Sequence, residues 1–331
     1  SGGVHHPFFQ GETAKMAKYI IKRILLAILI LFGTSIIIYF LVRNMPADYI
    51  DNQTAAQVQQ GLLTQEDVQR MKELYGIGDS SFGGLVKGYF EWLWNLLKGD
   101  LGISFIYGQP VAQVISKYMW ISFGISFVAL FFQIIISIPL GIWAAVKHDK
   151  FTDYVLRFFS FIGNSLPNFF VALLMQLFSI KWKLLPVISG GTTVQGAILP
   201  TLTLAIAMSA KYMRQVRAAV LEELNKDYVL GAAARGVRRR VILWKSVLKS
   251  AMLTILTLLA LSIGSLLGGT AIIESIFMWD GVGKLAVDAI TMRDYPLIQA
   301  YVVWMAIIYV MVNLVTDILY HVLDPRIRLG V

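Results

Sequence analysis

Histidine, cysteine and nucleotide-binding motifs, which carry much of enzyme chemistry, are sparse in this chain. There is no Cys, so disulfides and thiolate metal sites are excluded, and there are four His. His6, His148 and His321 share no short spacing, so we expect no metal site built from His. The phosphate-binding pattern Gly-x-x-x-x-Gly-Lys-[Ser/Thr] does not occur. The long apolar stretches contain no paired carboxylates and no His cluster. We therefore expect no catalytic residues, no bound cofactor and no enzyme activity in this chain.

The segment 227–246, DYVLGAAARGVRRRVILWKS, is polar and small between two long apolar runs. Alanine and glycine let another surface approach closely, and Gly236 suits a helix C-terminus. Asp227 could cap the start of this helix. The segment therefore predicts a short helix with a small-residue face that inserts into a groove on a soluble partner. For Arg238–Arg240 the alternative is that they only set topology and bind anionic lipid headgroups.

The overall composition indicates a protein embedded in lipid. Of the 331 residues, 57% are hydrophobic and 15% are charged, whereas soluble domains average roughly 25% charged residues. The net charge of +9 would suggest a nucleic-acid partner in a soluble protein. In a membrane protein, positive charge flanks the spans and reports orientation, so we expect no nucleic-acid ligand.

Six apolar segments reach the length of about 20 residues that a helix needs to cross a bilayer. They lie at about 19–42, 121–146, 152–180, 197–216, 247–273 and 298–322. The fold class predicted is an all-α integral membrane protein with six transmembrane helices. We expect a leader at 1–15, a first span at 16–42, an extracytoplasmic segment at 43–118, a five-helix core at 119–323 that includes a helix at 227–240, and a cytoplasmic tail at 324–331.

Basic residues set the orientation of these spans. Residues 211–249 carry ten Lys and Arg against three acids, whereas 43–118 carries six against eight and 274–296 two against four. The stretch before the first span is also basic. By the positive-inside rule, both termini and the segment at 227–240 lie in the cytoplasm.

Helix-breaking and polar residues inside the spans suggest a bundle that surrounds a polar path. Breakers occur at Pro139 and Gly141, in GNSLPNF at 163–169 and in GSLLGG at 264–269. The candidates for lining the path are Asn164, Ser165, Asn168, Gln176, Ser209 and Ser262. The alternative for each is a hydrogen bond between helices.

The stretch DYVLGAAARGV resembles the EAA loop of ABC-importer permeases of the peptide/nickel branch, approximately D-Y-V-x-x-A-R-A-K-G. Ala233 and Arg235 stand where that pattern has Arg and Lys. Further stretches resemble the same branch in the same order: GDLGISFIYGQPV at 99–111, IPLGIWAA at 138–145, LPNFF at 166–170, GGTAIIESIFMWDGVGKLAVDAITMRDYPLIQA at 268–300 and LDPRIR at 323–328. Departures occur at Ser246, Ser250 and Thr254, where the family usually has His, Asn and Pro, and at Asp280, where it has Pro.

The resemblance implies a type I importer permease, here the B-type subunit, which works by alternating access. Its partners would be a homologous second permease, two ATP-binding subunits that carry ATP and Mg²⁺, an extracytoplasmic binding protein and membrane lipid. The coupling residues would be Asp227, Tyr228, Gly231, Ala232, Ala233, Ala234, Arg235 and Gly236. The membrane would be a bacterial or archaeal plasma membrane.

The implied cargo is a di- or oligopeptide, with nickel or a nickel chelate as the alternative. A channel or a secondary transporter that works without ATP is a more remote reading. It would need an ionic pathway or an inverted repeat inside the spans, and the sequence shows neither.

Overall fold

The computed structural model describes residues 7–45, 49–74, 81–188 and 193–323 of the chain. Within these ranges the regular structure is helical, apart from an isolated bridge between Ile103 and Pro110. The chain divides into two compact units. The first unit comprises 1–20, 121–280 and 311–331, and the second comprises 21–120 and 281–310.

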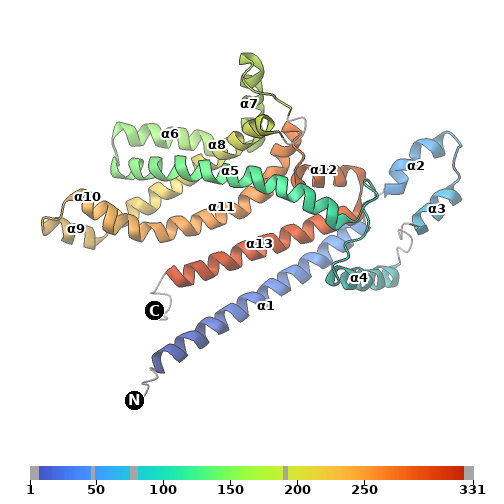
Figure 1. The fold of residues 1–331 in the computed structure, drawn as a ribbon, viewed down its shortest axis with the longest axis horizontal. Coiled ribbons are helices and arrows are strands. Elements are labelled where there is room, and N and C mark those ends of the chain that lie inside the picture. The colour runs from blue at the N-terminus through green and yellow to red at the C-terminus, as the bar shows by residue number, and fades with distance from the viewer. Residues whose placement is uncertain (1–6, 46–48, 75–80, 189–192, 324–331) are drawn as a thin grey trace. The chain divides into compact units, whose positions relative to one another are not determined.

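Fourteen helical elements are described in these ranges, and Figure 1 labels most of them. They are α1 (Pro7–Arg43), α2 (Tyr49–Gln59), α3 (Gln65–Leu74), α4 (Phe82–Leu97), α5 (Val111–Val146), α6 (Phe151–Ser165), α7 (Asn168–Trp182), α8 (Val194–Leu224), α9 (Asp227–Ala234), α10 (Arg239–Ile242), a π-helical turn η1 (Leu243–Val247), α11 (Leu248–Phe277), α12 (Val282–Met292) and α13 (Tyr295–Leu323).

Five helical stretches among the described residues are long and apolar enough to cross a membrane. They are Ile20–Arg43, Val111–Val146, Val194–Leu224, Arg239–Gly264 and Tyr295–Ile318. The pair α6 and α7 passes the same test together but is bent by 103°. The bend follows from Pro167, because the residue before a proline is pushed out of the α region, and Leu166 is extended at φ −81° and ψ 130°. This break lies inside the interruption that the sequence predicts at 163–169.

Several helices extend beyond the boundaries expected from hydropathy. The helix α1 begins at Pro7, inside the segment assigned to a leader, and α5 begins at Val111, inside the segment assigned to the outside. The helix α8 continues to Leu224. Good helix formers such as Ala, Lys, Glu and Gln continue a helix into water, so helix ends need not mark the edge of the hydrocarbon. The tail at 324–331 and residues 1–6 of the leader lie outside the described residues.

In the first unit, α8 packs against α6, α7 and α11. Two glycines permit close approach to α8. A Cβ atom on Gly141 of α5 would lie 2.7 Å from Val216 Cγ1 and 2.9 Å from the Met213 carbonyl oxygen. A Cβ atom on Gly163 of α6 would lie 2.6 Å from the Cβ atom of Ala210. Small residues therefore bring these backbones together, as is common between membrane helices.

Two apolar clusters form the core of the first unit. One joins α5, α7, α8 and α11 around buried residues such as Leu204, Ile273 and Phe277. The other, which we call the hub cluster, contains Ala145, Tyr212, Val216, Ala219, Val220, Ile242, Val247, Leu248, Ala251 and Ile255. The hub cluster lies at the end of the unit from which α9 and α10 extend (Figure 1).

The second unit has its own core, in which Val42, Val111, Ile115 and Leu297 are buried. Asp294 is buried and organises one loop of this unit, since its Oδ2 accepts hydrogen bonds from Ser104 Oγ at 2.5 Å and from the Ile106 amide at 3.0 Å. Asp294 Oδ1 also accepts from the Leu297 amide at 3.2 Å. The carboxylate therefore caps α13 and holds the loop around 104–106 at the same time.

The helix α3 begins with a reciprocal pair of hydrogen bonds between Thr64 and Asp67. Thr64 Oγ1 accepts from the Asp67 amide at 3.2 Å, and Asp67 Oδ2 accepts from the Thr64 amide at 3.0 Å. This reciprocal arrangement is a capping box, which fixes the start of α3. Hydrogen bonds from Thr64 hold the pKa of Asp67 below its usual value.

Candidate functional site

The helix α9 begins immediately after α8. Lys226, with an extended backbone at φ −77° and ψ 148°, precedes the helix, and no side chain caps its first amides. The expectation that Asp227 caps this helix is therefore wrong. Asp227 is instead the first helical residue, where its negative charge still favours the helix N-terminus through the dipole.

The helix α9 ends at Ala234 in a glycine-dependent stop. Gly236 has φ +80°, its amide donates to the Ala233 carbonyl at 2.9 Å, and the Val237 amide donates to the Ala232 carbonyl at 3.2 Å. These two bonds form a Schellman motif, which requires a left-handed residue. The prediction for Gly236 is confirmed, but the single helix expected over 227–240 is not, because the chain turns at Gly236 and a second helix starts at Arg239.

The two faces of α9 have different environments. Val229 and Ala232 are half-buried and pack against the hub cluster. The opposite face is exposed, and its members recur at helical spacing: Asp227, Leu230, Gly231 and Ala234. We call these four residues the outer face of α9. Ala233, Arg235 and Gly236 are exposed as well, whereas Ala232 belongs to the inner side.

Leu230 is a residue of the outer face that sequence reasoning missed. Its side chain is 67% exposed and lies on the side of α9 opposite Val229 and Ala232. The signal was present in the spacing, since 227, 230, 231 and 234 share one side of a helix. The outer face thus combines one apolar side chain with two small residues and a carboxylate.

Polar contacts tie α9 to the end of α8. Glu223 accepts from Tyr228 Oη at 3.0 Å through Oε2 and pairs with Lys226 Nζ through Oε1. Burial raises the pKa of the Tyr228 hydroxyl, and the hydrogen bond to Glu223 raises it further. The hydroxyl therefore stays protonated and donates at physiological pH.

The candidate path residues separate into three groups. Ser165 and Ser262 donate to carbonyls one turn earlier on their own helices, those of Phe161 and Leu258. Gln176 of α7 donates to the Ile276 carbonyl of α11 at 3.0 Å, so it links two helices. The other three candidates, for whose side chains no hydrogen bond is recorded among the described residues, are Asn164 and Asn168, both exposed, and Ser209, which is buried.

Gln133 is a buried polar residue that sequence reasoning did not single out. Its side chain on α5 is fully buried, and neither amide atom has a hydrogen-bond partner among the described residues. Ser137, one turn later, donates to the Gln133 carbonyl at 2.6 Å and lies 3.3 Å from the Ser209 carbonyl on α8. An amide at this depth is costly unless it finds a partner. The α5–α8 contact therefore carries buried polar groups, as do the helices that hold Gln176 and Ser209.

Glu274 and Asp153 are fully buried carboxylates of the first unit. Ser122 Oγ of α5 donates to Glu274 Oε1 of α11 at 2.5 Å. Arg217 of α8 donates to both oxygens of Asp153 of α6, from Nε at 2.7 Å and Nη2 at 2.8 Å. Each carboxylate thus joins two helices, and the Arg217–Asp153 pair has the bidentate geometry of a strong ion pair.

His148, Asp149 and Asp153 come together at the turn between α5 and α6. Their nearest potential ligand atoms lie within 4.8 Å of one another. Both oxygens of Asp153 already accept from Arg217, and the Asp149 carboxylate lies 3.0 Å from His148 Nδ1. This arrangement favours an ion-pair network over a metal site.

Comparison with known proteins decides the family. Residues 137–329 match the model of the binding-protein-dependent transport system inner membrane component. The chain belongs to this family. The permease is 34% identical over 326 residues to the oligopeptide transport system permease protein AppB of Bacillus subtilis, covering 95% of this chain and 100% of that protein.

Two further relatives match over most of their length. The permease is 36% identical to the nickel import system permease protein NikB of Staphylococcus aureus, covering 94% of this chain and 92% of that protein. It is 34% identical to the metal-staphylopine import system permease protein CntB of the same species, and the match covers 95% of this chain and 99% of that protein.

Solved structures show the same fold at low sequence identity. An inward-facing MetNI methionine ABC transporter chain matches with a TM-score of 0.50 and 17% identity, over 64% of this chain and 97% of that chain. An amino acid ABC transporter solved with histidines matches with a TM-score of 0.50 and 17% identity, over 65% of this chain and 94% of that chain. The protein is therefore an inner-membrane permease component of a binding-protein-dependent transport system, and it has the fold of type I ABC-importer permeases.

Proposed function

We propose that the outer face of α9 is the surface through which ATP-binding subunits drive this permease, and that the spans respond by alternating access. The observation that carries the proposal is the two-sidedness of α9. Its inner side, Val229 and Ala232, is packed into the hub cluster, while its outer face is exposed and rich in small residues. A helix that is packed against the protein on one side and exposed on the other can serve as a docking surface for another subunit.

The hub cluster explains how force on α9 would reach the spans. It contains Ala145 from α5, Val216 and Val220 from α8, and Leu248 and Ala251 from α11. Packed interiors transmit displacement because they contain few voids. A push on α9 would therefore move the ends of three long helices together, and the ties through Glu223 would prevent α9 from moving alone.

We place α9, both termini and the α5–α6 turn in the cytoplasm of a bacterial or archaeal cell, with the permease in the plasma membrane. The support is the distribution of basic residues, since Arg235, Arg238–Arg240 and Lys245 cluster around α9 and are exposed. The segment containing α2, α3 and α4 would then lie outside.

The assembly proposed has a second, homologous permease, two ATP-binding subunits and an extracytoplasmic binding protein. ATP and Mg²⁺ would be bound and used on the ATP-binding subunits, since this chain contains no Gly-x-x-x-x-Gly-Lys-[Ser/Thr] loop. Membrane lipid would surround the exposed apolar side chains of the spans.

The cargo proposed is a di- or oligopeptide, with nickel or a nickel chelate as the second candidate. Relatives of similar identity belong to an oligopeptide transport system, a nickel import system and a metal-staphylopine import system. The path candidates are amides and hydroxyls, and the chain has no Cys, whereas Ni²⁺ favours imidazole and softer ligands. Such a path suits a neutral or zwitterionic peptide, or a metal already wrapped in a chelator. Competition of labelled tripeptide uptake by Ni²⁺–chelate in cells expressing the importer distinguishes the two.

A substitution on the outer face tests the coupling proposal. A Cβ atom at Gly231 would meet nothing within 4 Å inside the chain, so Gly231→Leu should leave folding and membrane insertion intact. It should reduce co-purification of the ATP-binding subunits and abolish uptake, because a leucine would stand between the two surfaces. Gly83→Leu in α4, also unobstructed, is the control and should retain co-purification. Normal uptake by Gly231→Leu would overturn the proposal.

A further inference from the structure

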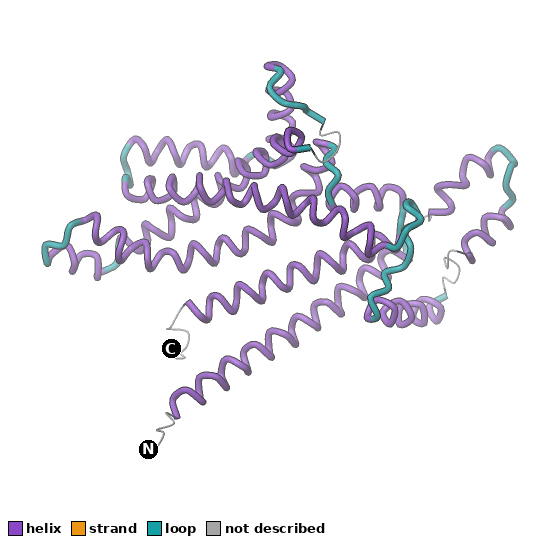
Figure 2. The backbone as a smooth tube through the Cα atoms, viewed as in Figure 1, coloured by secondary structure: helices purple, strands orange, loops and turns teal. Residues whose placement is uncertain are grey.

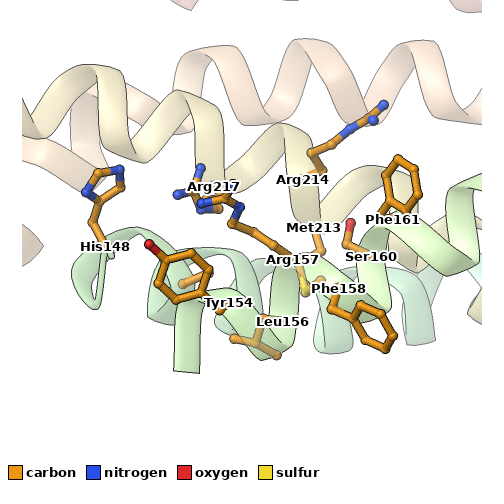
Figure 3. Close-up of a pocket in the computed structure, with 11 residues that line it drawn as sticks. His148, Tyr154, Leu156, Arg157, Phe158, Ser160, Phe161, Met213, Arg214 and Arg217 are labelled. Carbon is orange, nitrogen blue, oxygen red and sulfur yellow. The ribbon is translucent and has the colours of Figure 1, made fainter. Parts of the chain in front are cut away.

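A cationic pocket of about 590 Å³ lies between α6 and α8 in the first unit. Three arginines line it: Arg157 of α6, and Arg214 and Arg217 of α8. Figure 3 shows Arg157 and Arg217 converging near the centre of the pocket and Arg214 reaching away along it. His148 lines one end. None of these residues belongs to α9 or to the path candidates.

The charges of the pocket are only partly balanced. Asp153 is fully buried and is satisfied by the bidentate contact with Arg217. Arg157 Nη1 lies 3.9 Å from the same carboxylate, and its guanidinium stacks over the Tyr154 ring with 5.4 Å between Cζ and the ring centroid. Arg214 is exposed and has no ion-pair partner among the described residues. Three guanidinium groups thus stand against two carboxylates, Asp153 and the neighbouring Asp149, which leaves the pocket with net positive charge.

One wall of the pocket is aromatic and faces outward. Tyr154, Phe158 and Phe161 of α6 line it, and each ring is more than half exposed. Exposed aromatic rings on an apolar helix that crosses a membrane lie against lipid, and tyrosine favours the level of the headgroups. The pocket therefore joins a cationic wall on α8 to a wall on α6 that suits acyl chains.

The position of the pocket along the unit fits the membrane–water interface. His148 lies in the turn between α5 and α6, and Ala145, three residues earlier, belongs to the hub cluster that α9 packs against. Figure 2 shows this turn and the loop between α9 and α10 at the same end of the first unit. Basic pockets between transmembrane helices at this level bind anionic lipid headgroups.

We propose that this pocket binds the phosphate headgroup of an anionic phospholipid, with the acyl chains along the aromatic face of α6. Arg157 would contact the phosphate oxygens directly, and the exposed side chain of Arg214 would reach them by turning toward Arg157. Arg217 would contribute charge from its fixed place beside Asp153. Free phosphate shares this chemistry but would leave the aromatic wall unused. A bound lipid would bridge α6 and α8 and stabilise their packing. The inference does not depend on α9 contacting an ATP-binding subunit.

Native mass spectrometry of the assembled importer tests this inference. The complex is purified from membranes as wild type, as Arg157→Gln with Arg214→Gln, and as Lys249→Gln. Lys249 is an exposed base near the start of α11 and outside the pocket, so it controls for general loss of positive charge. Each basic residue near the surface contributes about fivefold in anionic lipid affinity, so the double variant should bind the lipid about 25-fold more weakly and retain less of it. Lys249→Gln should retain nearly as much lipid as the wild type.

A second arm separates the possible occupants. Delipidated complex is reconstituted into nanodiscs of phosphatidylglycerol or of phosphatidylcholine, or is kept in detergent with inorganic phosphate added. The thermal stability of the complex is measured in each condition. Stabilisation by phosphatidylglycerol alone, lost in the double variant and kept in Lys249→Gln, supports the inference. Equal stabilisation by inorganic phosphate, equal lipid retention by all three proteins, or burial of the two arginines by another subunit in the complex would each overturn it.

Discussion

The hydroxyl of Tyr228 donates a 3.0 Å hydrogen bond to Glu223 Oε2, which ties the first turn of α9 to the last turn of α8. Lys226, between them, pairs with the other oxygen of the same carboxylate. The tie matters because α9 is only eight residues long, and isolated helices of that length are unstable in water. The conformation of α9 therefore depends on Glu223 and on the packing of its inner side.

Removing this tie should loosen α9 without unfolding the permease. Tyr228→Phe keeps the ring and loses the hydrogen bond to a charged acceptor, which is worth about 1.5–3 kcal/mol. We expect faster hydrogen exchange of the α9 amides and reduced uptake, with unchanged yield in the membrane. Because the pKa of Tyr228 is raised, the tie should be fully present below the ordinary tyrosine value near 10 and be lost as pH rises through the higher pKa of the folded protein. Exchange in α9 equal to that of the wild type would contradict this role.

The effects of substituting Asp153 and Arg217 on the stability of the protein should be strongly coupled. Arg217→Ala leaves the fully buried Asp153 without its main partner, and breaking a buried pair from one side costs about 3–5 kcal/mol. Asp153→Ala should be similarly costly, while the double substitution should cost less than the two singles combined. Thermal unfolding of the four proteins in detergent measures the coupling. Additive losses of stability would show that the two residues act independently.

Close packing of α5 on α8 should make Gly141 intolerant of side chains. Gly141→Val would place Cβ against the Met213 carbonyl oxygen and the Val216 side chain, and overpacking of this kind costs about 1–3 kcal/mol. Gly124→Val on the same helix is the matched control, because a Cβ atom there meets nothing within 4 Å. We expect lower thermal stability for the first variant and little change for the second.

Asp294 should control the loop around Ser104. Asp294→Ala removes the acceptor for Ser104 Oγ and the Ile106 amide and the cap of α13. We expect the loop to become sensitive to limited proteolysis, and the loss of a cap alone costs about 1 kcal/mol. Asp294→Asn can still accept at one oxygen and should be protected more than the alanine variant. Equal protection of the wild type and the alanine variant would contradict the role of Asp294.

Most of the helical architecture could be predicted from hydropathy and from the positions of helix-breaking residues. Apolar length locates the long helices, and Pro167 with its preceding residue locates the bend between α6 and α7. Helix ends were less predictable, as the early start of α5 at Val111 shows. The reason is that hydropathy marks where a helix enters lipid, while capping and propensity decide where it ends.

The candidate site was predictable in outline but not in its contacts. Gly236 was identified because a left-handed helix end requires glycine. The exposed Leu230, the Tyr228–Glu223 bond and the unpaired amide of Gln133 depend on which side of each helix faces the core. That orientation is set by packing against helices distant in sequence, such as α5 against α8, and no local pattern encodes it.

Single cysteine substitutions test whether the outer face of α9 contacts an ATP-binding subunit in the cytoplasm. The chain has no native Cys, so each introduced thiol is the one that reacts. Ala234→Cys lies on the outer face of α9, and Leu62→Cys is an exposed site before α3. In whole cells and in the assembled importer, Ala234→Cys should be protected from a membrane-impermeant maleimide and should cross-link to an ATP-binding subunit. Leu62→Cys should be labelled from outside and form no such cross-link. Labelling of Ala234→Cys from outside, or its failure to cross-link in a complex that hydrolyses ATP, would contradict the account.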